Sequence, residues 1–272
     1  MTPAWTTDVA TTDLGRAVRY TLLWGLEGVA LRTVGGPADR VPFVNEAALR
    51  ARLSEADLPV VAVDPGLFEG PAHGRAGWLD DVDRLEETAA FCRRVGCGVV
   101  RVGALVADAD GADAEDASGA RVEALRRAAA VAARHGLRLA VRNEAEGAVP
   151  TGADLADLLR AVGHDAAGAD WRPADALRAG ESPTEGLAAL LGAGVALACV
   201  GVRDGRVEGD GWTEAAVGEG AVGWGRQLEA LAAAGYAGPL VLDALPGPAR
   251  AHGLAASTAL VTAARRARRA AG

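Results

Sequence analysis

The chain has 272 residues, 50% of them hydrophobic, so it is long enough to bury one full core and we expect a single domain. Its formal net charge of −8 argues against a nucleic-acid surface, because phosphate binding needs a clustered basic face. The three cysteines are odd in number and form no CxxC pair, which indicates small buried side chains rather than disulfides or a zinc site.

All 28 basic residues are arginine. A Schiff base needs an amine that can lose its proton, and a guanidinium group cannot serve. The composition therefore excludes lysine-dependent aldolases, pyridoxal phosphate enzymes and the Walker-type phosphate loop. No uncharged segment approaches the ~20 residues that cross a bilayer, and no basic-then-apolar leader opens the chain. We expect a soluble cytoplasmic protein with no membrane partner.

Strand-like and helix-like segments alternate along the chain. The expected strands cover residues 6–9, 28–32, 58–64, 98–102, the start of 137–147, 167–171, 195–203 and 240–242. The expected helices cover residues 13–24, 45–55, 78–95, 120–135, 153–162, 184–191, 223–234 and a last helix ending near 269. Asp13 and Asn45 are the expected N-caps, and the acidic segment 107–119 is expected to be a solvated loop. Eight strands and eight helices favour a single (β/α)8 TIM barrel, an α/β fold.

In such a barrel the functional site lies at the carboxyl ends of the strands. The polar residues expected there are Arg32, Asp64, Arg101, Arg142, Asn143, Glu144, Asp170, Arg172, Arg203, Asp204 and Asp243. Alternation of side chains along a strand points Arg142, Asp170 and Asp243 inward. Two interpretations stay open: arginines and carboxylates at one mouth can form an anion-binding pocket, or a structural ion-pair network such as Arg142 with Asp243.

A GxGxxG pattern occurs at Gly218, Gly220 and Gly223. No expected strand comes directly before it, and no acidic residue at the right distance completes a dinucleotide-binding unit. A tight turn before a helix explains the pattern, and phosphate contact at the start of that helix is the alternative.

Several motifs resemble the xylose isomerase-like barrels, which include sugar phosphate isomerases and epimerases. Residues 218–243, GEGAVGWGRQLEALAAAGYAGPLVLD, resemble the family's GEG, helix, GYxGPL and acid-ended strand. VGVRDG at 200–205 is similar to the family's HxKDG, DWRP at 170–173 to a strand ending in Asp-Pro, and VRNE at 141–144 to ENH or ENE. The resemblance spans about residues 14–260.

Family enzymes, the resemblance implies, hold a divalent cation with a Glu, an Asp, a His and a Glu on the fifth to eighth strands, and the two glutamates move protons. The corresponding residues here are Arg142, Arg172, Gly201 and Asp243. Hard cations need several oxygen or imidazole ligands, and two guanidinium groups would repel one, so we predict no metal and no other cofactor. If Asp243, Asp170 and Glu144 have rebuilt a site, the metal would be Mn²⁺ or Mg²⁺.

Two hypotheses for function follow. In the first, a diverged family member without metal-dependent catalysis binds a small anionic or polyhydroxy ligand, or acts as a partner subunit. Its ligand-binding residues would be Arg142, Arg172, Asp64, Arg101, Asn143, Asp170, Arg203 and Asp204. In the second, the protein is an isomerase or epimerase of sugars or keto acids that uses Asp243 and Glu144 for proton transfer. A third interpretation, a DNA-repair endonuclease, is disfavoured because such sites need many His and carboxylate ligands and a basic groove, which this sequence does not supply. Related barrels often pair, which leaves a homodimer open.

Overall fold

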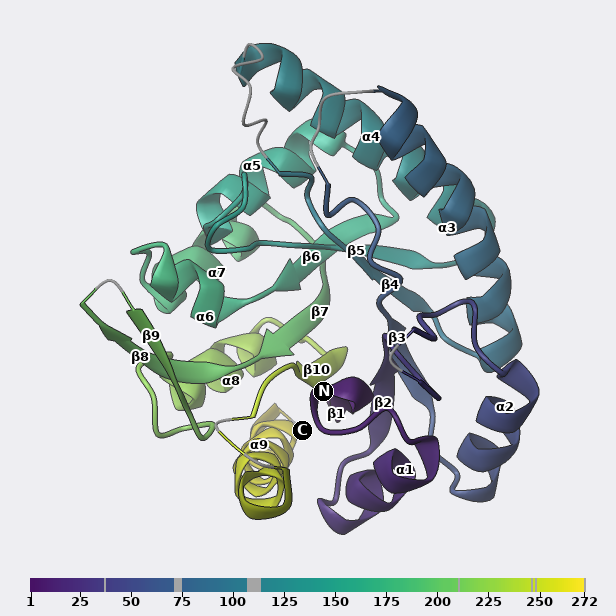
Figure 1. Cartoon of the computed structure of the whole chain (residues 1–272). Coiled ribbons are helices and arrows are strands. Elements are labelled where there is room, and N and C mark those ends of the chain that lie inside the picture. The colour runs from purple at the N-terminus through teal and green to yellow at the C-terminus, as the bar shows by residue number, and fades with distance from the viewer. Residues whose placement is uncertain are drawn as a thin grey trace.

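The computed structural model describes residues 1–36, 38–70, 75–106, 114–209, 211–245, 247 and 249–271. Within them, eight parallel strands close into a barrel (Figure 1). In the order in which they pair, the strands are β1 (Thr2–Thr6), β2 (Gly28–Leu31), β3 (Val60–Val63), β4 (Val99–Val102), β5 (Arg138–Arg142), β6 (Ala167–Trp171), β7 (Leu197–Val202) and β10 (Pro239–Leu242). β10 pairs with β1 and closes the ring, which confirms the predicted TIM barrel.

The helices surround this barrel (Figure 1). They are α1 (Leu14–Leu23), α2 (Glu46–Glu55), α3 (Arg75–Val95), α4 (Ala114–Arg134), α5 (Gly152–Val162), α6 (Pro173–Arg178), α7 (Pro183–Gly192), α8 (Trp224–Ala233) and α9 (Ala249–Ala271). The predicted caps of α1 and α2 are confirmed, because Asp13 accepts from the amide of Arg16 at 2.6 Å and Asn45 from that of Ala48 at 3.1 Å. Among the described residues, no helix is both long and apolar enough to cross a membrane.

The core has two parts of different size. Large apolar side chains fill the space between the barrel and the helices, and all three cysteines are buried and free, as predicted. The barrel interior holds a smaller cluster of mostly small side chains: Ala30, Ala62, Ala140, Ala198, Cys199 and Val241. Ala140 and Val241 therefore face inward and Leu240 and Leu242 outward, as the alternation predicted. Small interior residues leave space for longer side chains that enter from the carboxyl ends of the strands.

Four expectations for the elements were wrong. The first strand is Thr2–Thr6, and the expected residues 7–9 form a 3-10 helix instead. Pairing with β10 and burial of Trp5 fix this strand, and neither is visible in a threonine-rich local pattern. A short helix, α6, begins at Pro173, where Pro occupies the first helical turn. α4 begins at Ala114, so residues 114–119 are helical, while 107–113 lie outside the described residues.

The fourth difference is a β-hairpin in a segment that was expected to be a loop. β8 (Asp204–Glu208) pairs antiparallel with β9 (Gly211–Ala215), and the pair stands beside the barrel mouth (Figure 1). Strand propensity is weak here, since the sequence is rich in Gly and acidic residues. With the hairpin and α6, the described chain has nine α-helices rather than eight, and ten strands rather than eight.

Candidate functional site at the barrel mouth

Arg101, at the end of β4, joins two carboxylates across the barrel mouth. Its side chain is 1% exposed. Its Nε donates to Asp170 Oδ2 at 2.9 Å, and its Nη1 and Nη2 donate to the two oxygens of Asp243 at 2.8 and 2.6 Å. Thr6 Oγ1 also donates to Asp243, at 2.7 Å. The buried guanidinium is therefore held by paired, short, charge-assisted bonds.

This arrangement fixes the charge of Asp243. Burial alone would raise the pKa of its carboxyl group, but the positive charges of Arg101 and Arg172 and the hydrogen bonds from Arg101 and Thr6 lower that pKa well below its ordinary value. Asp243 is therefore a charged acceptor whose two oxygens are already engaged. A carboxylate with so low a pKa is a poor proton acceptor.

A second network lies on the β3 and β5 side of the mouth. Arg142, 4% exposed, donates from Nε to Glu144 at 2.6 Å and from Nη1 to Asp64 at 3.3 Å, and its Nη2 pairs with Glu69. Arg40 reaches Asp64 from the β2 side, with its Nη2 3.4 Å from Oδ1. Although burial would raise the pKa of Asp64, the surrounding arginines, Arg142 first among them, lower it. The charges of Arg142 and Asp64 are therefore balanced by other side chains of the protein.

Gly66, which follows β3, makes room for Arg40. Gly66 has a φ of +71°, and a Cβ placed on it would lie 2.3 Å from Cζ of Arg40. Because the Asp-Pro-Gly sequence after β3 has glycine at position 66, the Arg40 guanidinium can pack directly against the backbone there. Sequence reasoning missed Arg40 and Glu69, because both lie in loops, away from the strand ends.

The ion-pair network therefore exists, but the predicted pair of Arg142 with Asp243 was wrong. Asp243 pairs with Arg101, and Arg142 pairs with Asp64, Glu69 and Glu144. The long Arg101 side chain reaches across the mouth past Gly201 of β7, which has no side chain to obstruct it. A Cβ on Gly201 of β7 would lie 3.3 Å from Arg101 Nη2 and 3.0 Å from Asp243 Oδ2.

Arg172, just after β6, differs from Arg101 and Arg142 because its donors are not saturated. Its Nε is buried and has no hydrogen-bond partner among the described residues. Its nearest carboxylate oxygens are 3.6 Å away on Asp170 and 3.8 Å away on Asp243, and both already accept from Arg101. A buried guanidinium donor without a partner is costly, so this group can donate to an additional acceptor.

Asn143 holds Arg172 in position through its backbone. Its Oδ1 accepts from the amide of Arg172 at 2.9 Å, and its Nδ2 donates to the carbonyl of Arg172 at 3.0 Å and to that of Pro150 at 3.2 Å. These bonds engage both ends of the fully buried amide. They give Asn143 a structural role, and its predicted ligand contact stays a prediction.

A cavity of about 380 Å³ opens beside Arg172. Its lining includes Val106, Glu144, Glu146, Arg172, Asp175, Arg178 and Arg203. Arg178 pairs with Glu146 at 2.8 Å, and Arg203 donates from Nε to Glu214 at 2.7 Å. These two arginines have close carboxylate partners, so Arg172 is the cavity arginine with the most donor capacity left.

Asp204, predicted to bind ligand, instead organises the glycine-rich segment. Its carboxylate accepts from the backbone amides of Gly205, Gly218, Gly220 and Val222 at 2.8 to 3.2 Å. A Cβ on Gly220 would lie 2.0 Å from Asp204 Oδ1, so only glycine allows this close approach. The GxGxxG pattern is a turn wrapped around a buried carboxylate, and the predicted ligand contact of Asp204 stays a prediction.

We expect Asp204→Ala to lower the free energy of unfolding by about 3 kcal/mol or more, because it leaves several buried backbone donors without an acceptor. Urea denaturation followed by circular dichroism measures this loss. Asp204→Asn keeps one acceptor oxygen and should lose less. A loss below ~1 kcal/mol in the alanine variant would show that the turn does not depend on this carboxylate.

The four positions that the resemblance assigns to metal ligands hold Arg142, Arg172, Gly201 and Asp243. In the described part of the chain, no group of three or more His, Cys, Asp or Glu side chains is placed to hold a metal ion. The space in front of Gly201 is bounded by Arg172, whose Cγ would be 2.9 Å from an added Cβ. The space next to Gly201 and Asp243, two of these four positions, is therefore taken by the side chains of Arg101 and Arg172.

Comparison with known proteins agrees with this architecture. Residues 18–260 match the family model of the xylose isomerase-like TIM barrel. The chain belongs to this family. A search of curated proteins finds no match for it. The family extends over nearly the whole barrel, from α1 into α9, as the sequence motifs indicated.

Solved structures of family-like barrels superpose over almost the full chain. One described as L-ribulose 3-epimerase has a TM-score of 0.77 at 20% identity, covering 99% of this chain and 96% of the other. A xylose isomerase domain protein from Alicyclobacillus acidocaldarius has a TM-score of 0.76 at 20% identity, covering 98% and 99%. The 3-keto-D-glucoside 4-epimerase from E. coli in its apo form has 0.74 at 16%, covering 97% and 99%. At these identities the likeness shows the fold alone.

Proposed function

We propose that this family member binds a small anionic, polyhydroxy ligand at the barrel mouth and uses arginine in place of a divalent metal. One observation carries the proposal: the buried Nε of Arg172 has no hydrogen-bond partner among the described residues, and this side chain lines the 380 Å³ cavity. A carboxylate or phosphate oxygen in the cavity would accept hydrogen bonds from this guanidinium, which matches both groups in geometry. Charged Glu144 and Glu146 on the same wall would accept hydrogen bonds from hydroxyl groups of the ligand.

A divalent cation does not fit the residues at the four family positions. Asp243 is the one potential ligand there, and both of its oxygens accept from Arg101. Asp170 is likewise bonded to Arg101, and Arg172 stands within 4 Å of both carboxylates. The guanidinium groups of Arg101 and Arg172 already lie beside these two carboxylates, and they would repel a cation.

The neighbours support a sugar-like ligand. Two of the superposed structures are described as sugar epimerases, one for L-ribulose and one for a 3-keto-D-glucoside. Active sites of this fold lie at the carboxyl ends of the strands, where the cavity beside Arg172 is found. The cytoplasmic location and the homodimer stay predictions from the sequence.

The alternative, an active isomerase or epimerase that uses Asp243 and Glu144, has less support. The lowered pKa of Asp243 makes it a poor base, and Glu144 accepts from Arg142 at 2.6 Å. Deuterium incorporation beside the carbonyl of a ketose, followed by NMR in D2O, would reveal such proton transfer. Exchange that disappears in Glu144→Gln would establish the alternative.

Isothermal titration of EDTA-treated protein tests the proposed function. The panel comprises D-gluconate, D-glucuronate and D-glucose 6-phosphate, with neutral D-glucose and D-fructose as controls. We expect saturable binding of at least one anionic compound, and weaker binding of the neutral sugar with the same number of carbons. Absence of binding across the anionic compounds, or equal binding of the neutral ones, would overturn the proposal.

A further inference from the structure

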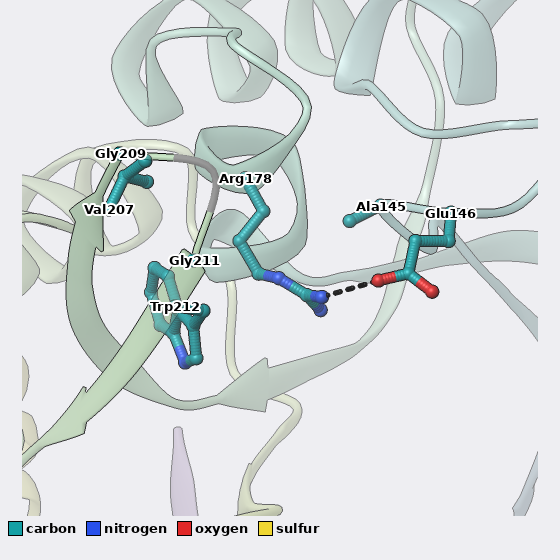
Figure 2. A pocket seen from close by; sticks show the side chains of 7 residues that line it. All are labelled: Ala145, Glu146, Arg178, Val207, Gly209, Gly211 and Trp212. Carbon is teal, nitrogen blue, oxygen red and sulfur yellow. Dashed lines mark hydrogen bonds and ion pairs between the residues drawn. The ribbon is translucent and has the colours of Figure 1, made fainter.

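A second cavity of about 360 Å³ lies next to the first one, between the hairpin and the loop after β5. Ala145, Glu146 and Arg178 line both cavities, so the two are adjacent. Figure 2 shows the ion pair of Arg178 with Glu146 on one side of the second cavity and Trp212 of β9 on the other. One wall is thus charged and the facing wall is aromatic.

The hairpin holds Trp212 as a fixed platform. Its Nε1 donates to Glu214 Oε1 at 2.9 Å, and the Arg203 guanidinium lies 5.8 Å from the ring centre. A Cβ on Gly205 would lie 2.5 Å from the indole ring, so glycine at this position lets the ring settle against the backbone. Val207, the cross-strand partner of Trp212, is 47% exposed. A pre-oriented ring loses little freedom when a ligand stacks on it.

We infer that this second cavity binds a second sugar ring, so that the ligand is an acidic disaccharide or glycoside rather than an acidic monosaccharide. The inference rests on the proposed function, because the acidic unit occupies the first cavity beside Arg172. The second ring lies between Trp212 and the pair of Arg178 with Glu146. The glycosidic bond crosses the shared boundary at Ala145.

The chemistry of the two walls selects a carbohydrate. A pyranose ring presents an apolar C–H face that suits an indole ring, and hydroxyl groups at its edge that suit a guanidinium and a carboxylate. A purely aromatic or aliphatic group would stack on Trp212 but would take Arg178 and Glu146 out of water without hydrogen-bonding them. Gly209 and Gly211, which have no side chains, complete the lining beside Trp212.

Paired titrations of D-gluconate and lactobionate test the inference, because lactobionate is gluconate that carries a galactose unit. We expect lactobionate to bind about tenfold more tightly, which corresponds to ~1.4 kcal/mol. Trp212→Ala should remove this gain and leave gluconate affinity within about twofold, while Trp212→Phe should retain most of it. Thr213→Ala, on the opposite face of the hairpin, is the matched control and should keep the full gain.

The outcomes separate this inference from the proposed function. If gluconate binds and lactobionate binds no more tightly, the second-ring site is wrong and the first site stands. If the gain persists in Trp212→Ala, the second ring lies elsewhere and the inference is also overturned. Failure of both compounds to bind overturns the inference, and absence of binding across all the anionic compounds of the panel overturns the proposed function as well. Near-ultraviolet circular dichroism of each variant verifies that the barrel remains folded.

Discussion

Arg101→Met is expected to lose about 3–5 kcal/mol of unfolding free energy at pH 7, the cost of leaving buried charges without their partner. Asp170 has a side chain 0% exposed and Asp243 one 14% exposed, and both depend on this guanidinium. Methionine retains most of the length of the side chain but supplies no donor. Urea denaturation measures the difference between the variant and the unchanged protein. Arg127→Gln, which breaks an exposed pair with Glu123, is the control and should lose less than ~1 kcal/mol.

The same pair of proteins should differ in pH dependence. In the unchanged protein the folded pKa of Asp243 lies below its ordinary value of 3.8, so the stability it contributes is fully present above that value and is lost as the pH falls further. In Arg101→Met, Asp243 keeps its burial, which raises its pKa, but loses the largest of the influences that lower it, so its pKa rises and its charged form costs more stability at pH 7. The deficit of the variant should therefore shrink as the pH is lowered from 7 toward 4. A deficit that stays constant over this range would contradict the assignment to buried carboxylates.

Arg172→Gln is expected to weaken binding of the anionic ligand by about 30-fold or more, which corresponds to at least ~2 kcal/mol for a lost charge-assisted contact. The same change should alter the free energy of unfolding by less than ~1 kcal/mol, because the nearest carboxylates of Arg172 lie beyond hydrogen-bond distance. Isothermal titration with the tightest compound of the panel measures the first effect, and urea denaturation the second.

Arg178→Gln is the matched control in the same cavity. Arg178 already pairs with Glu146 and Asp175, so its replacement should change the affinity for an acidic monosaccharide by less than about fivefold. Equal losses in Arg172→Gln and Arg178→Gln would indicate a general effect of positive charge rather than a contact by Arg172. Unchanged affinity in Arg172→Gln would show that Arg172 does not contact the ligand, and would contradict the proposed site.

The barrel could be predicted because its signals are local. The continuous apolar run before Asp64 and the Asp and Asn caps of α1 and α2 are set by neighbours in the chain, and the structure places these elements within a few residues of the prediction. The first strand was misplaced because its position depends on pairing with β10, more than 230 residues away. The hairpin was missed because its strands, DGRVE and GWTEA, contain glycine and acidic residues and no apolar run.

The candidate site was predictable as a set of residues but not as a set of partners. Position after a strand placed Arg101, Arg142, Arg172 and Asp243 at one mouth, since the strands of a closed barrel end at the same face. Which guanidinium meets which carboxylate depends on side-chain length and on the space left at Gly201, and neither follows from spacing in the sequence. The same rule predicted Asp204 and Asn143 as ligand-binding residues, although in the structure both side chains accept hydrogen bonds from backbone amides.

Metal content tests most directly whether arginine has taken the place of a divalent cation at this mouth. Purified protein would be incubated with Mn²⁺, Mg²⁺ or Zn²⁺, freed of excess ion and measured by elemental analysis. We predict far less than one ion per chain, and no change in Asp243→Asn. Near-stoichiometric metal that is lost in Asp243→Asn or Asp170→Asn would contradict the account, because Arg101 and Arg172 would then have to leave the carboxylates to a cation.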